Sequence, residues 1–172
     1  IDDAVALSVL HGYQKRGFIE LAAVTVSRGS NNAARYTDAL NTYYGRPNIP
    51  IGIYRGGTVA PRSTNNDRYT VLASNYPHDV HQSSIPDGYV VQRQVMARAQ
   101  SENRRVIIIQ TGFSGNVSQL LNSQGDGISS LSGIQLIEAT VDLFSIMAGD
   151  LSGGFVEFNI EDDLSSAKNV FS

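Results

Sequence analysis

Residues 106–116 read VIIIQTGFSGN. The first five form a nearly continuous apolar run, VIIIQ, which is typical of a strand buried on both faces of a parallel sheet. The stretch from Thr111 to Asn116 follows this strand and opens a helix expected at 115–123, and its glycines allow backbone groups to approach a ligand closely. It lacks the lysine of a P-loop and the glycine spacing of a dinucleotide fingerprint. It therefore predicts a strand, a turn and a helix.

The same alternation of strands and helices extends along the rest of the chain. We predict helices at 3–16, 31–44, 88–101, 134–138 and 163–171, and strands at 20–27, 49–53 and 141–147. Apolar strands joined by helical crossovers predict a single α/β domain over 1–172, with a mostly parallel sheet flanked by helices on both faces. Residues 55–88 are polar and irregular, and we expect a long functional loop or a flexible insertion there.

The composition excludes several classes of protein. The 172 residues are 41% hydrophobic and 17% charged, as in a globular domain, and the net charge of −3 without a basic cluster argues against binding nucleic acid. No apolar run is long enough to span a membrane, so a membrane is not an expected partner. The absence of cysteine excludes disulfides and cysteine-based zinc or catalytic sites, and leaves the cytoplasm and the periplasm equally open.

Acidic and amide side chains gather at two places that suit polar chemistry. Asp2 and Asp3 begin the first helix, where they could supply oxygen ligands to calcium or act as exposed acids that favour the helix dipole. Near the other end, Glu157 and Asn159 flank an aromatic residue and could bind sugar hydroxyls. The alternative there is that acids of this segment, Asp162 or Asp163, cap a helix.

The histidines give a weaker signal. His11 lies on a helix, which favours a surface or packing role. His78 and His81 are three residues apart, a spacing that could suit a metal, but no third ligand accompanies them and we predict no histidine metal site.

Read in order along the chain, these motifs resemble the nucleoside hydrolases that prefer inosine and uridine. The similar stretches are Asp2-Asp3, IELAAVT (19–25), NTYYGRPNIPIG (41–52), Thr111-Gly112 before Asn116, Met147-Ala148-Gly149 and VEFNI (156–160). The resemblance runs over nearly the whole chain and is strongest to divergent bacterial relatives of the family. It implies a Rossmann-like, three-layer fold and the hydrolysis of the N-glycosidic bond of ribonucleosides by an activated water, with Ca²⁺ as cofactor.

The resemblance also assigns roles to individual residues. Asp3 would bind calcium through its carboxylate, and Thr111 would bind it through its backbone carbonyl. The ribose-binding residues would be Asp2, Glu157 and Asn159, with Met147 lining the sugar pocket. Asn31, or Ser30 beside it, occupies the position of a further ribose-binding asparagine. On this basis Asn159→Ala is expected to weaken sugar binding with little loss of stability.

The sequence departs from the family pattern in ways that leave alternatives open. The aspartate that activates water is expected upstream of Ile1, and a further calcium ligand and the leaving-group acid would follow Ser172, so we expect an N-terminal portion, incomplete at both ends, of a longer N-ribohydrolase. Gly153 and Gly154 stand where the family has another ribose-binding asparagine. The alternatives are a relative that binds or cleaves another sugar or glycoside, and an inactive sugar-binding relative. In each case the partner is a small nucleoside or sugar, and a homo-oligomer is compatible with the sequence.

Overall fold

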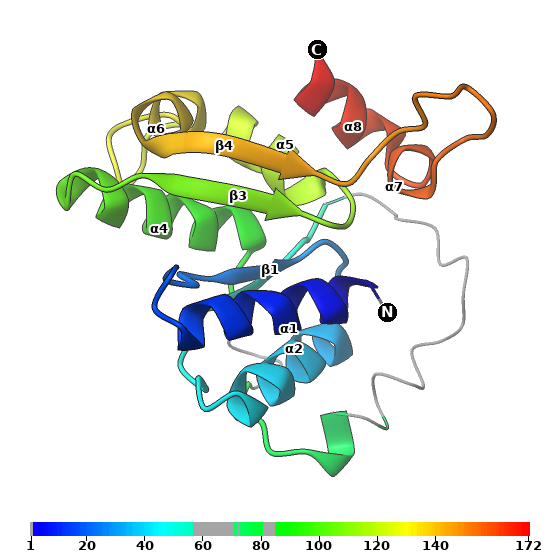
Figure 1. The fold of residues 1–172 in the computed structure, drawn as a ribbon. Coiled ribbons are helices and arrows are strands. Elements are labelled where there is room, and N and C mark those ends of the chain that lie inside the picture. Colours follow the sequence, from blue (N-terminus) through cyan, green and yellow to red (C-terminus); the bar gives the residue numbers. More distant parts are fainter. Residues whose placement is uncertain (1, 57–70, 72, 81–84) are drawn as a thin grey trace. The chain divides into compact units, whose positions relative to one another are not determined.

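The computed structural model describes residues 2–56, 71, 73–80 and 85–172, and the chain divides into two compact units (Figure 1). Unit 1 runs from Ile1 to Gly88 and unit 2 from Tyr89 to Ser172. The described part of each unit contains a two-stranded parallel sheet packed with helices, which confirms the α/β class in its coarse form. A single parallel sheet covered on both faces, and a single domain, stay predictions. Most of the loop expected at 55–88 lies outside the described residues.

Unit 1 is built as a helix followed by a strand–helix–strand segment. Its elements are α1 (Asp2–Lys15), β1 (Val24–Val26), α2 (Asn31–Tyr43) and β2 (Ile51–Ile53). The two strands pair in parallel from Val24 with Ile51 to Val26 with Ile53, and α2 packs against both while α1 packs against α2. The core therefore lies between α2 and the sheet, where the buried apolar residues are Ala34, Ile51, Ile53 and Ile85.

Local signals account for the limits of the unit 1 helices. Gly17 has φ +76° just after α1, a conformation that glycine adopts readily, and the Ser30 hydroxyl accepts a hydrogen bond from Ala33 N at the start of α2. Both helices confirm the predictions to within a residue or two. The strand predicted at 20–27 was too long, because only Val24–Val26 face the three residues of β2, and they are half-buried rather than fully covered.

A buried polar pair joins the two helices of unit 1. His11 Nε2 lies 2.9 Å from Asn41 Oδ1, and the imidazole ring stacks on Tyr44 with 4.6 Å between centroids. His11 is 3% exposed and Asn41 is fully buried, so His11 is a packing residue. Burial lowers the pKa of His11, the hydrogen bond to Asn41 opposes that shift, and the charge of Arg46 adds to it.

Unit 2 is built around a longer parallel pair of strands. Its elements are α4 (Gly88–Ser101), which starts at the boundary, then β3 (Val106–Gln110), α5 (Gly115–Asn122), α6 (Gly133–Thr140), β4 (Val141–Ile146), α7 (Phe158–Glu161) and α8 (Leu164–Phe171). These bounds confirm the predicted elements closely, apart from the short α7, which was not predicted. No helix in the described part of either unit is long and apolar enough to cross a membrane.

The sheet of unit 2 is covered by its own helices on one face only. Ile108 packs with the buried Met96, Leu120 and Leu136, which come from α4, α5 and α6. Its neighbours in β3, Ile107 and Ile109, are 57% and 46% exposed. The helices of unit 2 thus bury one face of β3, and burial of both faces stays a prediction. An unbroken apolar run does not by itself show how many faces of a strand are covered.

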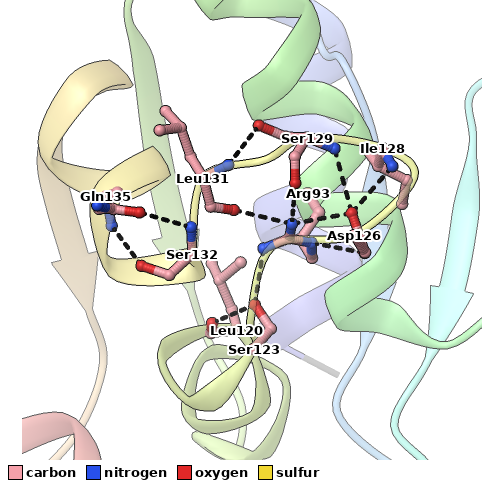
Figure 2. Close-up of polar contacts among 9 residues, drawn as sticks. All are labelled: Arg93, Leu120, Ser123, Asp126, Ile128, Ser129, Leu131, Ser132 and Gln135. Atoms are coloured by element: carbon pink, nitrogen blue, oxygen red, sulfur yellow. Dashed lines mark hydrogen bonds and ion pairs between the residues drawn. The ribbon is translucent and has the colours of Figure 1, made fainter.

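A buried arginine holds the loop between α5 and α6. Arg93 of α4 is fully buried, and its guanidinium donates to both carboxylate oxygens of Asp126 at 2.9 and 3.1 Å (Figure 2). It also donates to Ser123 Oγ and to the carbonyls of Ser129 and Leu131. The hydrogen bonds that Asp126 accepts from Arg93, and then those from the amides of Ser129 and Ile128, lower the pKa of Asp126 to about 2. One side chain from α4 thus fixes the path of a loop more than thirty residues away in sequence.

Candidate functional site

The ends of β3 and β4 are tied together by the side chain of Asn159. Met147 N, just after β4, donates to Gln110 O at 2.8 Å. Asn159 Nδ2 then donates to Met147 O at 2.9 Å and to Thr111 O at 3.2 Å. Three predicted site residues, from two strand ends and one helix, therefore lie in direct contact. This is the edge of a parallel sheet where ligands of α/β proteins bind.

Glu157 joins the same cluster because it caps α7. Its carboxylate accepts from Asn159 N at 2.9 Å and from Ile160 N at 3.2 Å, which satisfies amides at the start of the helix. The same carboxylate accepts from Gly149 N at 3.1 Å. The capping interpretation of the acids in this segment is also confirmed, since Asp163 caps α8 through Ser166 N. Glu157 thus holds α7 and the loop after β4 in fixed positions.

The remaining hydrogen-bonding capacity of the cluster consists of oxygen acceptors. Both protons of the Asn159 amide are used on carbonyls, and within the described part of the chain its Oδ1 has no hydrogen-bond partner. The carboxylate of Glu157 accepts known hydrogen bonds and has further acceptor capacity. A group of fixed acceptors suits a ligand that donates, such as a polyhydroxylated sugar.

Two further residues support the cluster and were not singled out from the sequence. The Phe113 ring is buried and packs against Phe158 of α7 at 5.4 Å. Gln110 is 8% exposed, donates to Ser114 Oγ, and has a buried Oε1 without a partner among the described residues. The sequence could have pointed to Gln110, because it is a polar residue at the end of an otherwise apolar strand.

Three predicted residues belong to unit 1. Asp2 and Asp3 are exposed in the first turn of α1, and Asn31 is the half-buried first residue of α2. Figure 1 shows the start of α1, the end of β1 and the start of α2 at one end of this unit. The Ser30 hydroxyl is already used as the cap of α2, which favours Asn31 over Ser30 as a ligand-binding group.

The described side chains contain no group of three or more His, Cys, Asp or Glu residues suited to holding a metal ion. His78 Nδ1 lies 2.9 Å from Tyr76 O, and His81 is outside the described residues. The oxygen ligands expected for calcium, the Asp3 carboxylate and the Thr111 carbonyl, are of the hard type that Ca²⁺ prefers.

Comparison with protein-family models, with curated proteins and with solved structures gives no match for this chain.

Proposed function

We propose that the protein is nucleoside hydrolase-like and takes part in hydrolysing the N-glycosidic bond of ribonucleosides. The observation that carries this proposal is the Asn159 amide, which joins the carbonyls of Thr111 and Met147 next to the Glu157 carboxylate. The family resemblance assigns Met147, Glu157 and Asn159 to the sugar and Thr111 to the calcium ion. Their direct contact at a strand end supports a common binding site for a sugar.

In this function the residues of unit 2 orient the ribose. Asn159 Oδ1 and the Glu157 carboxylate accept hydrogen bonds from sugar hydroxyls, and Met147 covers an apolar part of the ring. Fixing the sugar in this way favours reaction, because the ring must take up positive charge as the bond to the base breaks.

We assign Asp2 to the ribose as well, together with Asn31. Asp3 and Thr111 would hold Ca²⁺, which when bound polarises the sugar hydroxyls and lowers the pKa of the attacking water. The finer fold expected from the resemblance, a three-layer Rossmann-like arrangement with one mostly parallel sheet, belongs to the same proposal.

The test is reducing-sugar release from inosine and uridine by the purified chain, in calcium and again in EDTA. We expect ribose release that depends on calcium. Binding of ribose without release would instead favour the alternative of a sugar-binding relative. A folded protein that neither binds ribose nor releases it would contradict both.

Two variants make this test specific. Asp3→Asn is expected to remove the response to calcium, and Glu157→Gln to weaken ribose binding. Asp142→Asn is the matched control, because Asp142 is an exposed aspartate of β4 paired with Arg105 and lies outside the proposed site. Equal loss of release in the control would show that the effects are not specific to the site.

A further inference from the structure

The loop between β4 and α7 is folded around one carboxylate. Asp150 accepts hydrogen bonds from Ser152 N at 2.9 Å, Ser152 Oγ at 2.6 Å, Gly154 N at 2.7 Å and Phe155 N at 3.0 Å. The bond from Ser152 Oγ, followed by those from the backbone amides, lowers the pKa of Asp150 to about 2. The carboxylate is therefore ionised at neutral pH and acts as an acceptor for the whole turn.

Both ends of this loop are fastened to the strand-end cluster. At the start, Gly149 N donates to Glu157, and Met147 O accepts from Asn159. At the far end, Glu157 caps α7. Figure 1 shows the loop as the orange segment that leads from the end of β4 to α7. Its course is thus determined by the same residues that we assign to the sugar.

This ordered loop presents apolar side chains to solvent. Leu151 is 105% exposed and Phe155 is 70% exposed, while the polar groups of the turn are directed at Asp150. Large apolar side chains exposed on an ordered loop are a common feature of binding surfaces. Because the backbone is already held, a ligand meets a lower entropic cost on contact than it would with a flexible loop.

Building on the proposed function, we propose that Phe155, together with Leu151, contacts the base of a nucleoside whose ribose is held by Glu157 and Asn159. The protein groups follow the same order as the parts of a nucleoside. The polar residues Glu157 and Asn159 would face its sugar, and the apolar side chains would face the flat aromatic base that the sugar carries. Neither side chain has a hydrogen-bonding group to read the edge of the base. The contact therefore selects by ring area, so that a purine is favoured over a pyrimidine whatever its exocyclic groups.

The test is calorimetric titration of the full chain, in calcium, with ribose, formycin B and pseudouridine. The two nucleosides have a carbon–carbon glycosidic bond, so they are not hydrolysed during the measurement. We expect both to bind more tightly than ribose, with the purine-like formycin B the tighter. Phe155→Ala should reduce nucleoside affinity about tenfold, the scale of a lost aromatic stack, and leave ribose affinity unchanged.

Phe171→Ala is the matched control, because Phe171 is a 56% exposed phenylalanine of α8 in the same unit. Asp150→Asn is the second variant, and it should lower nucleoside affinity by loosening the loop while both apolar side chains remain.

The outcomes separate the two proposals. If ribose binds but the nucleosides bind no more tightly, or if Phe155→Ala keeps the preference for nucleosides, the base contact is wrong and the proposed function stands. If Phe155→Ala instead changes the sedimentation of the protein, the loop is a contact between copies of the chain and the base contact is again wrong. If neither ribose nor a nucleoside binds, the proposed function fails and the base contact fails with it.

Discussion

Asn159 is the residue for which sequence and structure lead to different expectations. The sequence suggested a surface ligand for sugar, whose removal would cost little stability. In the structure Asn159 is 7% exposed and supplies two hydrogen bonds to backbone carbonyls at the strand ends. A residue can serve both purposes here, because its amide nitrogen donates to carbonyls inside the protein while its Oδ1 accepts no hydrogen bond from the described residues.

We therefore predict that Asn159→Ala lowers the free energy of unfolding by about 1–3 kcal/mol, the cost of leaving carbonyls without their donor, and also weakens ribose binding. Urea denaturation and ribose titration measure the two effects. Asn122→Ala, at the exposed end of α5, is the control and should change neither. An Asn159→Ala protein with normal stability would show that the two carbonyls do not depend on this amide.

At the scale of elements, the packing of α1 on α2 involves the imidazole of His11, whose pKa is lowered by burial. Burial is the main cause of the lowered pKa of His11, so the folded protein resists its protonation. The unfolded chain takes up that proton at its ordinary pKa near 6.5, and the stability that neutral His11 contributes is fully present above this pH. As the pH falls below it, the free energy of unfolding decreases.

The corresponding prediction is that His11→Gln reduces the pH dependence of unfolding below the ordinary histidine pKa of 6.5. Denaturant titrations at several pH values measure this. His78→Gln serves as the control, because the His78 ring contacts only a carbonyl within its own segment among the described residues. The same pH dependence in wild type and His11→Gln would mean that His11 does not control the docking of α1.

The hydrogen bonds from the buried Arg93 to the loop between α5 and α6 lead to a second prediction. Arg93→Ala leaves the carbonyls of Ser129 and Leu131 without their donor and removes the ion pair that holds the loop. We expect a loss of about 3 kcal/mol in the free energy of unfolding, measured by chemical denaturation. Arg98→Ala, on the same helix with an exposed partner in Glu102, should cost no more than about 0.5 kcal/mol. Similar losses in both variants would indicate that burial of the guanidinium gives it no special role.

The elements also show what the sequence could predict. Helices such as 31–43 and 88–101 were predicted well because periodicity and caps are local properties of the chain. The extent of β1 and the exposure of Ile107 and Ile109 depend on partners far away in sequence, which a local pattern does not contain. The short α7 was missed for a similar reason, because Glu157 was interpreted as a ligand and not also as a helix cap.

At the scale of the whole molecule, the candidate site divides into the same two units as the fold. Within unit 2, the resemblance names Thr111, Met147, Glu157 and Asn159. The hydrogen bonds of Asn159 connect these four residues in the structure. Asp2, Asp3 and Asn31 belong to unit 1. Ribose release in calcium is therefore a property to be measured on the full chain, whereas ribose binding by Glu157 and Asn159 tests unit 2 more directly. The sequence could suggest the set of residues, but not the hydrogen bonds that already occupy them.

The sheet of unit 2 is covered by the helices of that unit on one face only, and this has a consequence for the chain before it has folded. Four consecutive aliphatic residues, VIII at 106–109, form a segment of the kind that starts aggregation, and Ile107, Ile109 and Leu143 remain exposed in the folded unit. Two arginines, Arg104 and Arg105, stand immediately before the segment, and Arg105 pairs with Asp142 beside it on β4. Charges in this position act as gatekeepers. The newly synthesised chain therefore carries charges that disfavour intermolecular strand pairing beside this apolar segment.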